Sequence, residues 1–241
     1  MKILSIGNSF SQDSQRYLHR LAKHNGVAMK TVNLFIPGCP LKTHYINVLD
    51  DNVAYNFEFN GEPTGIQVSI RQALISDNWD VVTLQQASTS SGKYETYSPY
   101  IQTVAEYVRK YCPHAKLYIH QTWAYEEGSE PLKNWTQFAS AEEMYSAIID
   151  AYAKAANAVQ ADGIIPCGEA MMAALKLGAE KVHRDCYHAS LGMGRYMLAL
   201  CWYKLFTGKD ITNDTFDDFD LPVSAAERAF AIKAVNSVLK A

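Results

Sequence analysis

Short apolar runs alternate with longer amphipathic stretches over most of this 241-residue chain, and this alternation restricts its fold more than any other feature. Five runs predict β-strands, at residues 2–6, 28–34, 80–84, 116–120 and 163–165. The remaining stretches predict helices at residues 11–25, 65–77, 99–111, 140–159, 168–177, 190–207 and 224–239. Strands that alternate with long helices form βαβ crossovers and a parallel sheet. We therefore expect an α/β fold, a three-layer α/β/α sandwich around a mostly parallel five-stranded sheet, with residues 1–241 as a single domain.

Three segments interrupt this alternation. Residues 47–64 contain an alternating run followed by Asn60-Gly61, which predicts a small hairpin or an edge excursion. Residues 121–139 form a long predicted loop with two tryptophans, and loops of that length in a compact domain are usually functional or mobile. Residues 209–222 are acidic and predict a surface connection to the last helix.

Charge and cysteine content argue against several classes of protein. The net charge of −3, without a cluster of Lys and Arg, gives no reason to expect nucleic acid as a partner. Five cysteines without a Cys-x-x-Cys pair argue against a disulfide framework and favour a reducing compartment. The sequence shows no signal peptide and no apolar run of roughly 18 residues that could span a membrane. We expect a soluble, cytoplasmic protein without a membrane partner, and the sequence gives no indication of its oligomeric state.

The loops that follow the predicted strands carry the candidate site. Ligands of open α/β sheets bind outside the carboxyl ends of the strands, so these loops are expected to share one edge. The polar or flexible residues in them are Ser9, Gly38, Gln85, Gln86, Gln121 and Trp123.

A possible catalytic set combines Ser9 with the Asp185-x-x-His188 segment near the other end of the chain. A serine hydroxyl is a poor nucleophile until a histidine removes its proton and a carboxylate orients that histidine. Ser9 alone is equally consistent with a helix N-terminus, and His188 alone with a hydrogen-bonded, partly buried histidine. The conjunction of the three residues makes a serine hydrolase the leading hypothesis.

These motifs resemble the SGNH (GDSL-type) serine hydrolases. The segment Gly7-Asn8-Ser9-Phe10-Ser11 resembles the first block of that family, with Asn8 where the family has Asp. Asp185-Cys186-Tyr187-His188 resembles the last block, and Gly38 resembles the glycine of the second. The whole pattern is most similar to a bacterial branch with Leu84-Gln85-Gln86 in place of the third block. The resemblance implies a flavodoxin-like α/β/α fold and a Ser9–His188–Asp185 triad that works through an acyl-enzyme, without metal or cofactor.

The third block departs from the family pattern. The family has Gly-x-Asn-Asp there, and its Asn side chain donates a hydrogen bond to the oxyanion. A glutamine amide can donate the same bond from one methylene further out. The motif offset favours Gln86, with Gln85 as the alternative, beside the backbone N–H groups of Ser9 and Gly38.

The substrate class is inferred from aromatic residues in the predicted loops and from the resemblance. Tyr and Trp present flat apolar area with a polar tip, which suits a sugar site. Relatives often remove acetyl groups from carbohydrates, so we expect a small-molecule ester, foremost an acetyl ester or an acylated carbohydrate. The residues considered for substrate contact are Trp123, Trp135, Tyr94, Tyr125, Gln121 and His44.

Three alternatives remain open. His183, Asp185, Cys186 and His188 include good metal ligands, although no second cluster completes a set. A nucleotide-binding or flavodoxin-like module has the same fold class, but the first βα loop lacks Gly-x-Gly-x-x-Gly and a P-loop lysine. A catalytically impaired relative that binds carbohydrate fits the altered third block.

Overall fold

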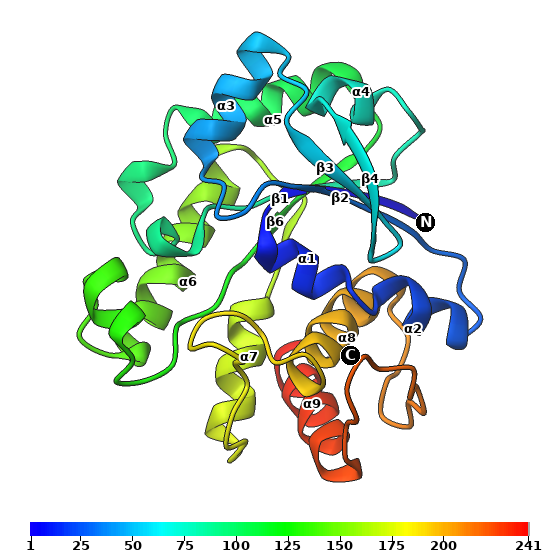
Figure 1. Ribbon diagram of the computed structural model, residues 1–241, viewed down its shortest axis with the longest axis vertical. Helices are drawn as coiled ribbons and strands as arrows, with labels where there is room; N and C mark the ends of the chain where they lie inside the picture. The colour runs from blue at the N-terminus through cyan, green and yellow to red at the C-terminus, as the bar shows by residue number, and fades with distance from the viewer. Residues whose placement is uncertain (241) are drawn as a thin grey trace.

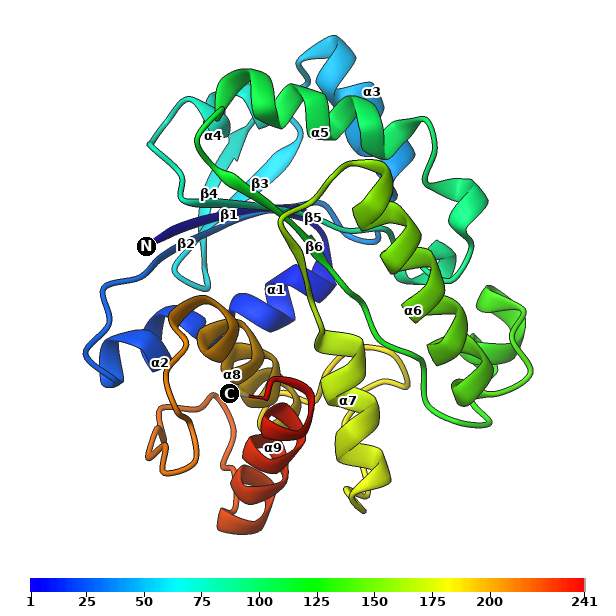
Figure 2. The same ribbon diagram turned by 180° about the vertical axis from the view of Figure 1, so that it is seen from behind.

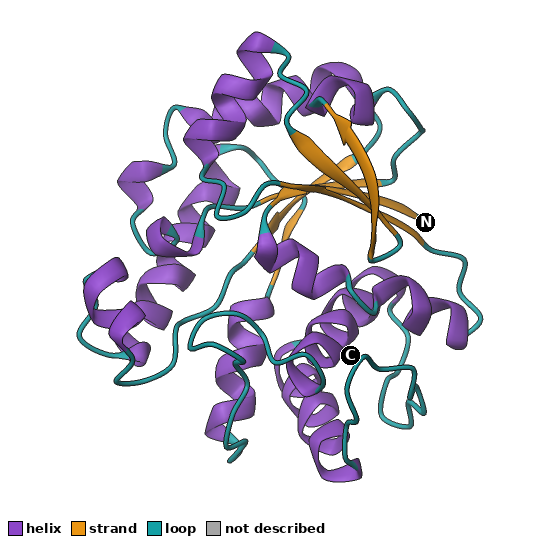
Figure 3. Cartoon of the chain, in the orientation of Figure 1, coloured by secondary structure: helices purple, strands orange, loops and turns teal. Residues whose placement is uncertain are grey.

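The computed structural model describes residues 1–240, within which seven strands form one sheet of order β4-β3-β2-β1-β5-β6-β7. Five of these strands are parallel and confirm the predicted ones. Their bounds are Lys2–Gly7 (β1), Lys30–Phe35 (β2), Val81–Leu84 (β5), Lys116–His120 (β6) and Gly163–Ile165 (β7). Figure 3 shows the sheet in orange between helical layers, so the predicted three-layer α/β fold is confirmed.

An antiparallel hairpin extends the sheet from five strands to seven. It consists of β3 (Tyr55–Phe59) and β4 (Glu62–Val68), with β3 paired to β2, and it confirms the hairpin predicted in 47–64. Asn60 and Gly61 have φ values of 52° and 84°, the left-handed conformations that a tight hairpin turn needs. The predicted helix at 65–77 is wrong at its start, because Ile66 belongs to β4 and pairs with Phe57 of β3. Only the short helix α4 (Ile70–Leu74) forms there.

The helices follow the prediction with two further differences. The predicted helix at 11–25 is divided into α1 (Ser9–Gln15) and α2 (Leu18–His24), and α3 (Leu41–Asp50) was not predicted. The other helices lie within two or three residues of their predicted bounds. They are α5 (Tyr100–Tyr111), α6 (Ala141–Ala158), α7 (Cys167–Lys176), α8 (Met193–Thr207) and α9 (Ala225–Val238).

The helices form two layers, one on each side of the sheet. Helices α3, α4, α5 and α6 cover one side of the sheet, whereas α1, α2, α8 and α9 lie on the other side with α7 (Figures 1 and 2). The central strand β1 is buried from Ile3 to Gly7, so the first loop of the chain begins at a fixed point in the core. No helix within residues 1–240 combines the length and apolar character that a membrane crossing requires.

Candidate active site

Ser9 is the first residue of α1 and follows β1 after a single connecting residue, Asn8. Asn8 is the N-cap of the helix, and its side-chain oxygen accepts a hydrogen bond from the N–H of Phe10 at 3.0 Å. The Ser11 hydroxyl accepts from the N–H of Asn8 and completes a capping box. Because a capped turn satisfies N–H groups that would otherwise lack partners, Ser9 is held rigidly at the carboxyl end of the central strand.

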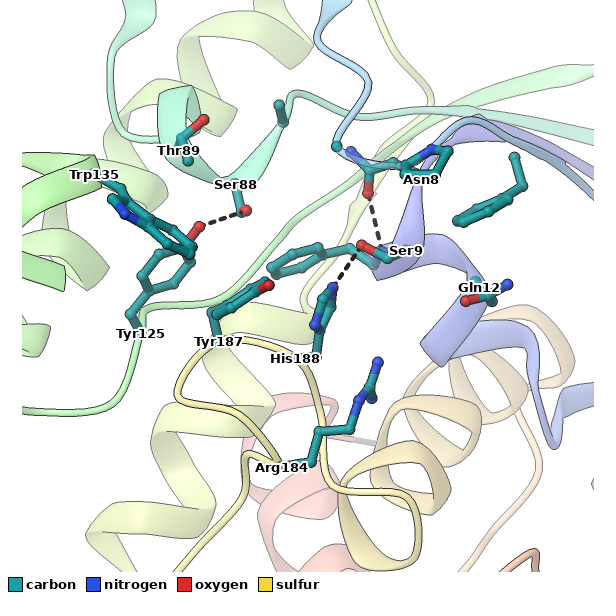
Figure 4. A pocket seen from close by; sticks show the side chains of 15 residues that line it. Asn8, Ser9, Gln12, Ser88, Thr89, Tyr125, Trp135, Arg184, Tyr187 and His188 are labelled. Atoms are coloured by element: carbon teal, nitrogen blue, oxygen red, sulfur yellow. Dashed lines mark hydrogen bonds between the residues drawn. The ribbon is translucent and has the colours of Figure 1, made fainter. Parts of the chain in front are cut away.

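Asp185 and His188 form a compact turn that faces Ser9 (Figure 4). One carboxylate oxygen of Asp185 accepts from the backbone N–H of His188 and the other contacts Nδ1 of its ring, each at 2.8 Å. The Nε2 atom of His188 lies 2.8 Å from Oγ of Ser9. With Nδ1–H donating to Asp185, Nε2 is free to accept the proton of the Ser9 hydroxyl.

The electrostatics of Asp185 agree with this tautomer. Partial burial acts to raise the pKa of Asp185, but the hydrogen bonds from the side chain and backbone of His188 outweigh it and leave the pKa below its ordinary value. The carboxylate is therefore charged at neutral pH, where it orients the imidazole and stabilises its protonated form.

Beneath Ser9, a buried chain of polar side chains fixes Asn8. The amide of Gln85 donates to Oδ1 of Asn8 at 2.6 Å, and the amide of Asn8 donates to the carbonyl of Cys39 at 3.2 Å. Nδ1 of His120 lies 2.8 Å from Oε1 of Gln85, and Nε2 lies 3.0 Å from the hydroxyl of Ser14. Both ends of the Gln85 side chain are therefore engaged below the site.

Gln86 is also engaged, on the far side of the loop. Its Oε1 atom accepts from the backbone N–H groups of Leu41 and Ala87, both at 2.9 Å. Its Nε2 atom donates to the carbonyl and hydroxyl oxygens of Thr96, both at 3.1 Å. Neither Gln86 nor Gln85 is among the residues that line the pocket around Ser9. The sequence-based choice of a glutamine as oxyanion donor finds no support in this geometry.

A pocket of about 450 Å³ opens over Ser9 and His188. The other residues that line it are Asn8, Phe10, Gln12, Phe35, Pro37, Gly38, Ala87, Ser88, Thr89, Tyr125, Trp135, Arg184 and Tyr187. Gly38 has a φ of 59°, a left-handed conformation that suits glycine at this bend after β2.

Three aromatic rings form one wall of this pocket (Figure 4). The Tyr187 ring lies 4.2 Å from the ring of His188, 5.3 Å from Tyr125 and 5.4 Å from Trp135 between centroids. Trp135 belongs to a short π-helix (Leu132–Thr136) in the long 121–139 loop, and it is 50% exposed. We refer to Tyr125, Trp135 and Tyr187 as the aromatic wall.

Tyr125 and Trp135 were considered for substrate contact, whereas Tyr187 was missed. Its position directly before His188 was the available signal, because consecutive residues of a chain lie close together.

The other proposed substrate contacts lie outside the pocket. Trp123 is fully buried beneath it, where its indole N–H donates to the carbonyl of Tyr187 at 2.7 Å. Oε1 of Gln121 accepts from the backbone N–H of Glu169 at 3.1 Å, which fixes the start of α7. Trp123 supports the site from below, and Gln121 connects two loops.

His44 and Tyr94 are also absent from the residues that line the pocket. His44 is 1% exposed, and its Nδ1 atom lies 2.8 Å from the hydroxyl of Tyr55. Burial lowers the pKa of His44 to about 3, so this ring stays neutral in the folded protein. Tyr94 packs against Tyr97 at 5.9 Å between centroids. The positions of His44 and Tyr94 give no support to the expectation that they contact substrate, and that expectation stays untested.

The residues considered as metal ligands point in different directions. Nε2 of His183 donates to the carbonyl of Ala124 at 3.0 Å, whereas the ring of His188 lies between Asp185 and Ser9. Across the 240 described residues, no group of three or more His, Cys, Asp or Glu side chains is placed to hold a metal ion.

This chain matches a known protein family over nearly its whole length. Residues 2–236 match the family described as Domain of unknown function (DUF4886). A crystal structure of a DUF4886 family protein from Bacteroides uniformis is 34% identical, with a TM-score of 0.90 over 99% of this chain and 94% of that one. No protein of curated function matches this chain.

Two more distant structures share the fold. A protein from Slackia heliotrinireducens, named as a candidate SGNH hydrolase, is 20% identical with a TM-score of 0.61 over 86% of this chain and 98% of that one. A family 3 carbohydrate esterase from Clostridium thermocellum is 15% identical with a TM-score of 0.52 over 85% of this chain and 94% of that one. At these identities the likeness extends to the architecture, which is that of SGNH hydrolases.

The burial of His183 predicts how protein stability depends on pH. His183 is 3% exposed, and burial lowers its pKa to about 4. Below the ordinary histidine pKa of about 6.5, the unfolded chain takes up a proton that the folded protein does not. His183 therefore lowers stability as the pH falls from about 6.5 towards 4. Between pH ~8 and ~5 this contribution amounts to about 2 kcal/mol.

Urea denaturation of the wild type and of His183→Gln at pH ~8 and pH ~5 measures this contribution of His183 to the free energy of unfolding. We expect the loss of unfolding free energy on acidification to be about 2 kcal/mol smaller in the variant. His114→Gln serves as the control because His114 is exposed. An equal loss in wild type and His183→Gln would contradict the prediction.

Proposed function

This chain belongs to the DUF4886 family, and we propose that it is a serine hydrolase that cleaves small acyl esters through Ser9, His188 and Asp185. The observation that carries the proposal is the continuous hydrogen-bonded chain from Ser9 Oγ through the imidazole to the carboxylate. Ser9 and His188 both line a pocket large enough for a small ligand.

The reaction follows from the roles of these three groups. Oγ of Ser9 attacks the ester carbonyl while Nε2 of His188 takes its proton, and the carbonyl π electrons move to the oxygen. When the tetrahedral intermediate collapses, the C–O bond to the alcohol breaks and His188 returns the proton to the leaving oxygen. Water then repeats the sequence on the acyl-enzyme, with His188 as the base, and releases the acid and Ser9. Asp185 remains ionised throughout and stabilises the imidazolium.

Backbone N–H groups are the proposed oxyanion donors. Ser9 and Gly38 both line the pocket, and within residues 1–240 neither backbone N–H donates a hydrogen bond. With Gln85 and Gln86 engaged elsewhere, the site has no side-chain amide in the place of the family asparagine. One such donor typically contributes about 2.7–4 kcal/mol to barrier lowering, so a two-donor site predicts modest turnover.

The substrate proposed is an acetylated sugar or glycan fragment. The exposed face of Trp135 and the neighbouring rings of the aromatic wall offer stacking surfaces for a pyranose ring. The carbohydrate esterase that shares this fold is consistent with that choice, although its identity of 15% supports the architecture alone. The pocket volume of about 450 Å³ favours a short acyl chain.

A second candidate is a carbohydrate-binding protein with impaired catalysis. The observation that favours it is the engagement of both glutamine amides away from the pocket, which removes the third oxyanion donor. In that case the wild type would bind sugars without hydrolysing any ester, and Ser9→Ala would bind them equally well.

Replacement of the nucleophile tests the hydrolase proposal. We expect Ser9→Ala to lower kcat/KM for p-nitrophenyl acetate by at least about a thousandfold, because the residual rate rests on binding and oxyanion contacts alone. Ser76→Ala is the matched control, since Ser76 is exposed beyond α4. If Ser9→Ala retained most of its activity in steady-state assays, Ser9 would not be the nucleophile.

Removal of the exposed tryptophan tests the substrate class. We expect Trp135→Ala to lower kcat/KM for acetylated sugars by about three- to tenfold, the loss of one stacking contact. Activity on p-nitrophenyl acetate should change little, and Trp135→Phe should retain most of the sugar activity. An equal loss on both substrates, or better wild-type activity on long-chain acyl esters, would contradict the sugar acetate assignment.

A further inference from the structure

Asp13 is a carboxylate with no solvent exposure, on the same helix as Ser9 and one turn further along. An ionised carboxylate in the protein interior is costly unless it is paired and fully hydrogen-bonded. Residues at i and i+4 of a helix lie on one face, so Asp13 is on the side of α1 that presents Ser9.

The partners of Asp13 enclose the segment that carries the other two members of the triad. Nη1 of Arg184 lies 2.9 Å from both carboxylate oxygens, and the backbone N–H of Ala189 donates to Oδ2 at 3.1 Å. Arg184 directly precedes Asp185, and Ala189 directly follows His188. One carboxylate thus holds both ends of the Asp-x-x-His segment against the helix of the nucleophile.

The segment itself is closed by further bonds that make it move as a unit. The backbone N–H of Arg184 donates to the carbonyl of His188 at 3.0 Å, and His183 and Ala189 form an isolated antiparallel bridge. Nη1 of Arg184 also donates to the carbonyl of Ala189 at 2.5 Å. A shift of Arg184 and Ala189 relative to α1 would therefore carry His188 with it.

We propose that Asp13 is a positioning residue that sets the distance between Ser9 and His188 by clamping the 184–189 segment to α1. This inference rests on the proposed hydrolase function. Asp13 does not line the pocket, so it acts through Arg184 and Ala189 rather than on substrate.

Arg184 is not proposed to bind an anionic substrate, because its guanidinium belongs to a network of charged side chains around Asp13. Nε of Arg195 donates to Oδ1 of Asp13 at 2.8 Å, and its Nη1 lies 3.3 Å from Asp220. Asp220 in turn accepts from Arg16 at 2.7 Å. Each guanidinium in this network is hydrogen-bonded to a carboxylate, and that of Arg184 is engaged by Asp13.

Asp220 provides a matched control for the clamp. It is bound to the same Arg195, but its hydrogen bonds do not include Arg184 or Ala189. Asp13→Asn places a carboxamide among the donors of Arg184 and Arg195, whereas Asp220→Asn weakens the network only at its outer edge. Comparison of the two variants separates loss of position from loss of stability.

The test measures kcat, KM and thermal unfolding of both variants with p-nitrophenyl acetate. We expect Asp13→Asn to lower kcat by about a hundredfold, with a much smaller change in KM, because a displacement of about 1 Å in a reacting group has that effect. Asp220→Asn should lower the melting temperature but retain kcat. If folded Asp13→Asn retained at least half of the wild-type kcat, or if both variants lost kcat equally, the proposal would be overturned.

A second variant and a second readout keep the test decisive. If Asp13→Asn does not fold, Arg184→Met removes the contact of Nη1 with both carboxylate oxygens and leaves Asp13 paired with Arg195, and we expect a loss of kcat of about tenfold. The NMR signal of the His188 imidazole N–H, assigned with His188→Gln, reports the alignment without any substrate. An unchanged signal in the Asp13 or Arg184 variant contradicts the clamp, and a broadened or shifted signal supports it. If wild type hydrolysed no ester, the hydrolase proposal alone would fail, and this signal would still decide the positioning role.

Discussion

The hydrogen bond between Ser9 and His188 joins residues 179 positions apart, and the arrangement of the fold around it makes that bond possible. Ser9 is fixed from one side because β1 is buried in the centre of the sheet and ends directly before α1. His188 is fixed from the other side because its segment is bound to α1 through Asp13. A short helix of seven residues thus connects the proposed nucleophile Ser9, the proposed base His188 and the central strand.

Two buried polar networks support that helix at different points. The first joins Asn8 to Gln85 and His120, beneath the N-terminus of α1. The second surrounds Asp13 at the middle of the helix. A buried polar network is stabilising only when each of its polar groups has a hydrogen-bond partner. If one partner is removed, the group left behind bears its full desolvation cost. The geometry of Ser9 and His188 therefore depends in part on side chains outside the pocket, such as Gln85, His120 and Asp13.

Much of the framework could be predicted from local patterns in the sequence. The five parallel strands are short apolar runs, and the Asp-x-x-His spacing is a local property, because an aspartate can accept from the backbone three residues later. The placement of Ser9 after β1 follows from the rule on strand ends. Helix α3 could not be found in this way, since Leu41–Asp50 mixes polar and apolar residues and follows a proline without a side-chain cap. The strand at residues 66–68 could not be predicted either, because only the partner strand shows that these residues pair.

The orientations of the polar side chains could not be predicted from the sequence. Gln85 and Gln86 are neighbours of the same type, and tertiary partners alone decide that one amide supports Asn8 and the other holds Thr96. The burial of His44 and Gln121 likewise depends on packing between distant segments. The burial and pairing of Asp13 could not be predicted, because nothing in its local sequence indicates that Arg184 and Arg195 converge on it.

A serine-directed fluorophosphonate probe tests most directly whether His188 activates Ser9. The purified protein would be treated with the probe, and the modified residue would be located by mass spectrometry in the wild type and in His188→Ala. We expect a single modification at Ser9 in the wild type and none in the variant. A folded wild-type protein that reacts nowhere, or reacts at Ser9 equally well without His188, would contradict it.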